Sequence, residues 1–170
     1  MTARRTVLGL ALAGALALAG CAVVPEGAIR REGRFSLSAK TPQGVENVSG
    51  RFLYLKAPGL SRLDLLTPLS GVIARIERTP QGASIARGAA DPLTGPDLDA
   101  LLTAQLGFAL PVDALEAMLT TPPAENETVA GDWRATVLSR EASGAPSRLR
   151  FTHLTEPPVT VTILLDPTQE

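Results

Sequence analysis

The sequence predicts a mainly β protein of the α+β class, built on a strongly curved antiparallel sheet with helices packed on or across it. Three observations support this prediction. Apolar and polar residues alternate from Gly33 onward and again after residue 131, the spacing changes to a helical one between Asp91 and Pro122, and glycine and proline separate the segments. A strand series interrupted by two short helices indicates a sheet whose apolar face the helices help to cover.

The first half of the chain reads as four or five strands. Residues 33–39 alternate apolar and polar side chains, and residues 48–57 form a second apolar run after a turn at 42–44. Residues 62–66 and 72–77 flank a turn rich in proline and glycine and make the clearest hairpin of the chain. A further turn at 79–82 leads into residues 83–87. The connections are short, so neighbouring strands are expected to pair antiparallel.

Two short helices are predicted next. Leucines at 98, 101, 102 and 106 lie on one helical face, with Pro96, Asp97 and Asp99 at the start and Gly107 at the end. A second helix starts at Pro111, places Val112, Leu115, Met118 and Leu119 on one face, and stops before Pro122. Their apolar faces must be buried, and the sheet is the available surface.

Strand alternation resumes after a predicted loop at 122–131. Three segments, 133–137, 149–151 and 159–165, each place apolar side chains on one face. Gly144-Ala145-Pro146 and Pro157-Pro158 punctuate the joins between them. The expected order is therefore four or five strands, two helices, then three strands.

The N-terminus has the pattern of a bacterial lipoprotein signal peptide. Arg4 and Arg5 precede an apolar run, Val7 to Ala19, which ends in small residues before Cys21. This run of 13 residues is shorter than the roughly 20 needed to span a bilayer. We predict that residues 1–20 are removed, that Cys21 carries a diacylglycerol and an N-acyl chain, that 21–31 form a tether, and that 32–170 form one domain. The alternative is an ordinary secretory signal beside a structural cysteine.

Composition disfavours several function classes. The chain has one cysteine and one histidine, too little material for a transition-metal site or for Cys or His nucleophiles. Removal of residues 1–20 changes the net charge from −1 to −3. The sequence shows no run of basic residues that would indicate a nucleic-acid partner. The sequence lacks the Gly-x-Ser-x-Gly elbow of lipid hydrolases, which disfavours that class of enzyme. We expect no enzyme and no cofactor, His153 at the surface near a strand end, Asp97 and Asp99 as capping residues, and Trp133 as a core or rim anchor.

Several sequence pieces, in this order, resemble the LolB family, outer-membrane lipoproteins that receive other lipoproteins from a periplasmic carrier. In bacterial lipoproteins generally, an aspartate after the lipidated cysteine favours retention in the inner membrane, so Ala22 at that position implies the outer membrane. The resemblance runs from Gly33 to about Asp166. It rests on Gly33-Arg34-Phe35 and Ser49-Gly50-Arg51-Phe52, which open the first two strands, on Leu65-Leu66-Thr67-Pro68-Leu69-Ser70-Gly71, on Ala74-Arg75-Ile76-Glu77, and on Leu106-Gly107-Phe108-Ala109-Leu110-Pro111-Val112.

The resemblance implies an incomplete, half-open β-barrel with a helical lid over an apolar cavity for acyl chains. At about 0.8 kcal/mol per buried methylene, three chains of roughly fifteen methylenes represent on the order of 36 kcal/mol of exposure to water. The predicted lining is Phe35, Leu37, Phe52, Tyr54, Leu98, Leu102, Leu115, Leu119, Val161 and Ile163. The alternative is that the same inward rows fill an ordinary core, because periodicity does not distinguish a filled sheet from an empty one.

Leu69 is the sharpest candidate residue. It lies at the hairpin tip formed by Pro68, Leu69, Ser70 and Gly71, where a leucine would project apolar area into water. The resemblance places it where the family carries a leucine implicated in delivering cargo into the membrane. The alternatives are a leucine folded back onto the sheet and a harmless exposed one, since isolated surface leucines are common.

The predicted function is that of a monomeric outer-membrane receptor facing the periplasm. Its expected partners are a LolA-like periplasmic carrier, cargo lipoproteins and outer-membrane lipids. The competing hypothesis is a structural or assembly accessory of the outer membrane that uses the same anchor and sheet to bind a protein partner. Binding of an apolar probe would distinguish the two, since only the first requires a cavity.

Overall fold

The computed structural model describes residues 27–41, 44–67 and 71–167. These residues form one ten-stranded antiparallel sheet and two helices. The strands are β1 (Ile29–Thr41), β2 (Gly44–Ala57), β3 (Leu60–Thr67), β4 (Gly71–Thr79), β5 (Gly82–Ala86), β6 (Leu93–Gly95), β7 (Glu127–Ala130), β8 (Trp133–Arg140), β9 (Pro146–His153) and β10 (Val159–Leu165), and the helices are α1 (Leu98–Leu106) and α2 (Val112–Thr120).

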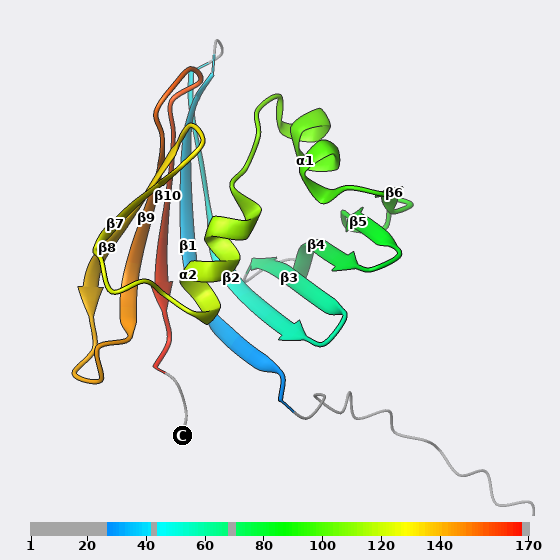
Figure 1. Cartoon of the computed structure of the whole chain (residues 1–170). Helices are drawn as coiled ribbons and strands as arrows, with labels where there is room; N and C mark the ends of the chain where they lie inside the picture. Colours follow the sequence, from blue (N-terminus) through cyan, green and yellow to red (C-terminus); the bar gives the residue numbers. More distant parts are fainter. Residues whose placement is uncertain (1–26, 42–43, 68–70, 168–170) are drawn as a thin grey trace, which may run out of the picture.

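The two halves of the chain meet in the middle of the sheet. The strand order is β6-β5-β4-β3-β2-β1-β10-β9-β8-β7, so β1 joins the first series of strands to the last strand. Phe35 pairs with Gly50 of β2 and with Ile163 of β10. The sheet ends at β6 and β7, which do not pair with each other. It bends into two arms, and α1 and α2 lie in the angle between them (Figure 1).

The predicted fold class is confirmed: a mainly β, open, curved antiparallel sheet with two helices on its concave side. Two strands were not predicted. β6 has three residues and β7 has four, and β7 lies in the segment expected to be a loop. Runs this short do not show a period. At the other end, β1 begins at Ile29, so residues 29–31 of the expected tether belong to the sheet.

Gly33 does not begin its strand as predicted but lies inside it, and Gly50 lies inside a strand that starts four residues before the predicted one. A Cβ added at Gly33 would overlap the carbonyl oxygen of Leu164, and one at Gly50 would overlap that of Leu66. Glycine inside a strand marks a bend or a close approach of backbones. These two positions therefore allow the sheet to coil tightly around its concave face.

The helices begin and end near the predicted residues. The side chain of Asp97 caps α1 by accepting hydrogen bonds from the amides of Asp99, at 2.7 Å, and Ala100, at 3.1 Å. Gly107 ends it in the left-handed conformation, with φ of 80°. Pro111 precedes α2, which ends before Pro122. Within the described residues, neither helix is long and apolar enough to cross a membrane.

Two apolar clusters hold the helices against the sheet. The smaller one joins Leu98 and Leu102 of α1 to Ala83 and Ile85 of β5. The larger one joins α2, through two buried residues at its C-terminal end, to four strands, with partly buried residues of β1 and β3 packed against it; its buried members are Phe52, Tyr54, Met118, Leu119, Trp133, Ala135, Val137, Leu149, Phe151, Val159, Ile163 and Leu165. α1 is thus packed on the arm that contains β5, whereas α2 packs against strands of both arms.

Candidate functional site

An apolar cavity of about 200 Å³ lies between the concave face of the sheet and the two helices. Side chains from both arms of the sheet, from both helices and from their linker line it. The structure places all ten predicted lining residues on its wall: Phe35, Leu37, Phe52, Tyr54, Leu98, Leu102, Leu115, Leu119, Val161 and Ile163. The concave face of this sheet is therefore not completely filled by its own side chains.

Ten further residues complete the wall. Eight are apolar and come from strands already expected to face inward, from the linker between the helices or from the first residue of α2: Leu63, Leu65, Ile76, Leu110, Pro111, Val112, Trp133 and Phe151. Alternation with Arg62 and Asp64 was the signal that could have identified Leu63 and Leu65. The other two, Ser61 and Glu116, are polar. Nothing in the pattern of an amphipathic helix indicates that Glu116 reaches the cavity wall.

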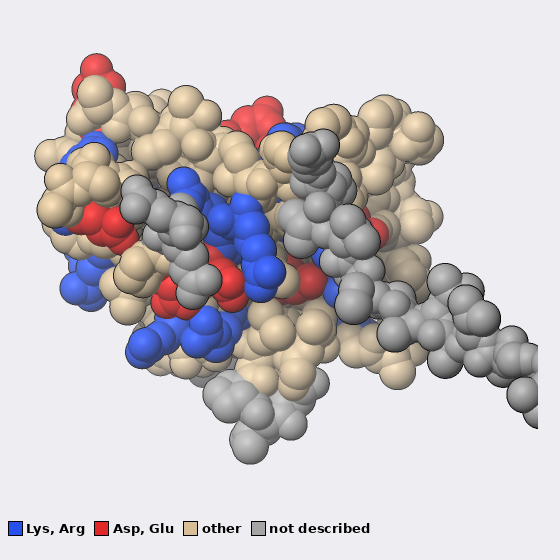
Figure 2. Space-filling view, turned by 90° about the horizontal axis from the view of Figure 1, so that it is seen from below, with Lys and Arg blue, Asp and Glu red and all other residues tan. Residues whose placement is uncertain are grey.

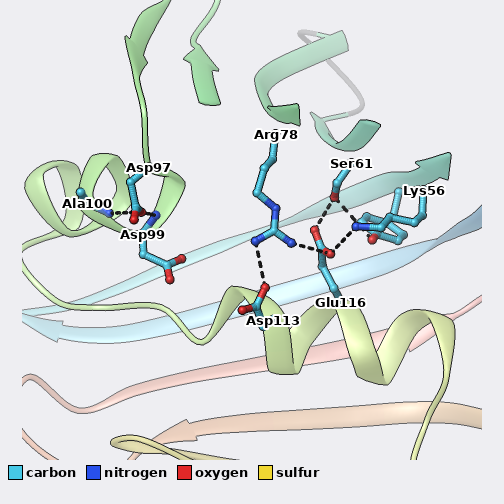
Figure 3. Close-up of polar contacts among 9 residues, drawn as sticks. Lys56, Ser61, Arg78, Asp97, Asp99, Ala100, Asp113 and Glu116 are labelled. Atoms are coloured by element: carbon cyan, nitrogen blue, oxygen red, sulfur yellow. Dashed lines mark hydrogen bonds and ion pairs between the residues drawn. The ribbon is translucent and has the colours of Figure 1, made fainter. Parts of the chain in front are cut away.

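Glu116 connects α2 to three strands through a polar cluster consisting of Lys56, Ser61, Arg78, Asp113 and Glu116 (Figure 3). Its carboxylate accepts a hydrogen bond from the Ser61 hydroxyl and one from Lys56 Nζ, at 2.9 Å. Arg78 of β4 reaches Glu116 Oε2 at 2.7 Å and Asp113 Oδ1 at 2.8 Å. Because Lys56, Ser61 and Arg78 belong to β2, β3 and β4, this cluster fixes one side of the lid to one arm of the sheet.

The electrostatics of this cluster favour the charged form of Glu116. Burial raises the pKa of Glu116, but the hydrogen bonds from Ser61 and Lys56 and the charges of Arg78 and Lys56 outweigh it, so that the pKa is lowered overall. Burial also raises the pKa of the neighbouring Tyr54 hydroxyl. The cluster therefore contains an ionised carboxylate at the edge of an apolar cavity, with its counter-charges close by.

The C-terminal end of α2 and the linker between the helices are held by other contacts. Arg31 Nε of β1 donates to the carbonyl oxygen of Leu119, at 3.0 Å, which satisfies a carbonyl of the last turn. Trp133 Nε1 of β8 donates to the carbonyl oxygen of Ala109, at 2.8 Å. The Phe108 ring lies 6.1 Å from the Trp133 ring. The lid is thus attached at both ends of α2 and at the linker.

His153 does not lie at the surface as predicted. It ends β9 as expected, but it is 8% exposed. Its ring lies 4.9 Å from that of Trp133 and 5.5 Å from that of Phe108. Its Nδ1 lies 2.7 Å from the carbonyl oxygen of Pro157, and Thr155 lies by Nε2. The Phe108 ring and the Pro157 carbonyl oxygen thus bury this histidine and give it a hydrogen-bond partner, and its ring packs against Trp133.

The remaining predicted site residues lie mostly outside the described part of the chain. Cys21, Pro68, Leu69 and Ser70 are not described. Gly71 is exposed and begins β4 with a positive φ of 64°. β3 and β4 are paired up to Thr67 and Gly71, so the predicted hairpin is confirmed on both sides of its tip. The roles of Leu69 and Cys21 stay predictions.

The sequence of this chain is similar to that of known proteins. A family model described as outer membrane lipoprotein LolB matches residues 28–155. A protein named outer-membrane lipoprotein LolB from Cupriavidus pinatubonensis is 36% identical over 134 residues, which cover 73% of this chain and 65% of that protein. Its namesake from Bordetella petrii is 34% identical over 149 residues, 82% of this chain and 72% of the relative.

The chain spans less than two thirds of some of these relatives, such as the one from Cupriavidus metallidurans, of which it covers 54% at 32% identity. Among solved structures, a LolA superfamily protein from Nitrosomonas europaea aligns with a TM-score of 0.41 and 10% identity, covering 81% of this chain and 84% of that one. The family match extends from the start of β1 to the turn after β9 and includes the whole lid. This chain belongs to the LolB family.

Proposed function

We propose that this chain is a lipid-anchored outer-membrane receptor that accepts lipoproteins from a LolA-like periplasmic carrier and inserts them into the membrane. The observation that carries the proposal is the apolar cavity beneath a two-helix lid. The cavity would bury cargo acyl chains, and acyl chains on Cys21 would keep the receptor at its target membrane. The relatives' name, outer-membrane lipoprotein, supports this location. The activity is binding and transfer rather than catalysis.

The size of the cavity adds a requirement to this proposal. Its volume of about 200 Å³ is below the roughly 300–1,000 Å³ of pockets that enclose drug-sized ligands. Several acyl chains need more room than this. Uptake therefore requires that the helices move away from the sheet, which makes the polar cluster and the Trp133 contact the places where opening begins.

Trp133 supplies a direct measurement of acyl-chain entry. It is the only tryptophan of the chain, it is 3% exposed, and it lines the cavity. A brominated fatty acid bound in the cavity should quench its fluorescence in a soluble version of the chain that begins at Ala22. Quenching should be saturable, and an unbrominated chain of the same length should reverse it by competition.

A matched pair of variants separates entry from surface adsorption. Val161→Trp would fill the cavity from β10, whereas Thr162→Trp would place the same ring on the opposite face of that strand. Because both add a second tryptophan, binding is better followed with a radiolabelled fatty acid. We expect at least about a tenfold loss of affinity for the first variant only, since overpacking removes the space the ligand needs. Equal binding by both variants would argue against the cavity.

Transfer itself is tested by mixing the soluble form with a carrier loaded with a labelled lipoprotein. The label should move to the receptor without ATP, because each acceptor buries the chains more favourably than the donor. A chain that binds no fatty acid and takes no cargo would instead be an accessory protein of the membrane.

A further inference from the structure

The outer face of the sheet, opposite the cavity, carries a row of arginines. Phe35 and Ile163 line the cavity, so the adjacent Arg34 and Leu164 point away from it. Arg34 lies opposite Arg51 of β2 and opposite Leu164 of β10, and Leu164 in turn lies opposite Arg148 of β9. Four neighbouring strands thus contribute one row across the outer face.

Arg150, two residues beyond Arg148, extends this row on the same face of β9. All four arginines and Leu164 are exposed, Leu164 to 41%. These five residues, Arg34, Arg51, Arg148, Arg150 and Leu164, are called the arginine strip below. Arg51 is paired with Asp166, at 2.7 Å. Among the described residues, the side chains of Arg34, Arg148 and Arg150 have no ion-pair partner.

The strip is not explained by the stability of the sheet. Like charges directly opposite one another on paired strands are destabilising, and Arg34 and Arg51 face each other in this way. Asp166 neutralises Arg51, but Arg34, Arg148 and Arg150 have no ion-pair partner among the described residues. Such unpaired positive charges are suited to an external anionic surface, which would neutralise them.

The shape and position of the strip favour a lipid surface over a protein groove. Four strands spaced about 4.8 Å apart give a row roughly 14 Å long, with an exposed leucine among the arginines. Arginine stems and aliphatic side chains side by side are typical of surfaces that lie at the headgroup level. Viewed from the end where β1 begins and β10 ends, basic side chains gather in the middle of the molecule, with acidic ones among them (Figure 2).

The anchor predicted at Cys21 is close enough to place the strip there. Cys21 precedes Ile29, the first residue of β1, by eight positions, a reach of at most about 28 Å. We propose that the arginine strip rests on an anionic phospholipid surface and orients the anchored receptor, with the lid and cavity on the side away from the membrane. This inference rests on the proposed function, which supplies the membrane.

The experiment uses the full chain, recovered from membranes with its own lipid. It is reconstituted into two kinds of vesicle, one of neutral phosphatidylcholine and one that also contains about 30% anionic phosphatidylglycerol, which gives the surface a negative potential. A single new cysteine at Ser36, exposed on the outer face of β1 beside the strip, carries an environment-sensitive dye. The control position is Thr94, exposed on the edge strand β6. We expect the emission of the dye at Ser36 to shift to the blue with phosphatidylglycerol, to revert in high salt, and to stay constant at Thr94.

Two charge-matched triple variants identify the residues responsible. Arg34→Gln, Arg148→Gln and Arg150→Gln together should abolish the shift, because each arginine near an anionic surface is worth about fivefold in binding. Lys40→Gln, Arg87→Gln and Arg134→Gln remove the same charge from exposed positions outside the strip and should leave the shift intact. Circular dichroism checks that both variants fold.

The outcomes separate this inference from the proposed function. Absence of a shift in folded protein, or an equal loss in both triple variants, would overturn the assignment of the strip. A shift that appears only when a carrier protein is added, and not with phosphatidylglycerol, would overturn it in favour of an acidic protein partner. Release of the chain from neutral vesicles would contradict the lipid anchor, which belongs to the proposed function. In that case co-sedimentation of the dye-labelled chain with anionic vesicles still tests whether the arginine strip binds them.

Discussion

Glu116 is the single charged residue on the wall of the cavity in the described part of the chain. A carboxylate at the edge of an apolar space is costly unless hydrogen bonds and counter-charges surround it. Ser61, Lys56 and Arg78 supply both. The same contacts hold α2 to the sheet, so the one charged residue of this apolar wall is also a residue that keeps the lid in place.

The lowered pKa of Glu116 makes a prediction about pH. Its contribution to stability is complete above its ordinary value of about 4.5 and is lost as the pH falls through the lower pKa of the folded protein. Glu116→Gln should therefore reduce the free energy of unfolding by about 1–3 kcal/mol at neutral pH. The difference from the unmodified chain should shrink below pH 4.5. Urea titrations at a series of pH values measure it.

Asp113→Asn is the matched control for this substitution. Asp113 also contacts Arg78, but its side chain is 83% exposed, and exposed ion pairs contribute little. It should change stability by less than about 1 kcal/mol. Equal effects of the two substitutions would mean that Glu116 does not fasten the lid, as would an unchanged rate of fatty-acid entry in Glu116→Gln.

Leu69 carries the prediction about delivery. If it partitions into the membrane surface as cargo leaves, Leu69→Glu should take up cargo from the carrier nearly normally and fail to release it into vesicles, because a charged side chain does not enter the apolar layer. Release is followed by flotation of labelled cargo with the vesicles. Leu69→Ala should be intermediate, and normal release by Leu69→Glu would refute the role.

The environment of a single residue was predicted well where alternation along its own strand determines which face it occupies. It was predicted poorly where a contact with a distant segment determines it. Phe35 and Val161 follow from alternation along their own strands. His153 is buried because Phe108, from the linker, packs on it, and Glu116 faces the cavity wall because Ser61 and Arg78 hold it there. These partners are brought together only by the bend of the sheet.

At the level of elements, that bend depends on two glycines inside long strands, Gly33 and Gly50, of which Gly33 was predicted to begin its strand. Gly50 faces Phe35 across the β1–β2 ladder, and an added Cβ would meet both the Leu66 carbonyl and the Phe35 ring. Glycine is a common boundary signal, so the part of β1 that precedes Gly33 was missed. The short strands β6 and β7 were missed for the different reason that they show no period.

Gly50→Ala tests the role of this glycine. The methyl group forces the β2 backbone away from β3 or displaces Phe35, and overpacking of this kind costs about 1–3 kcal/mol. Thermal unfolding should show the loss, and the cavity should bind fatty acid less tightly because its wall is rearranged. Ser49→Ala, next to it on the outer face, should change neither property, and a Gly50→Ala protein of unchanged stability would contradict the argument.

For the whole molecule, the sequence predicted the fold class, the order of the main elements and which side chains face inward. It did not establish that the space between them is partly empty, because alternation determines a face and not a volume. That property depends on how far α1 and α2 stand from the sheet. The contacts of Arg31, Trp133 and Glu116 hold α2 and the linker at this distance, and the packing of Leu98 and Leu102 on β5 holds α1.

The unpaired margins at β6 and β7 have a consequence for the range of cargo. In a closed barrel, strand number and stagger determine the radius, so the interior has one size. A sheet that ends at two separate strands can open or tighten its curl by small changes of twist without breaking a ladder of hydrogen bonds. If the cavity holds acyl chains as proposed, we expect this adjustable sheet to accommodate chains that differ in length and number.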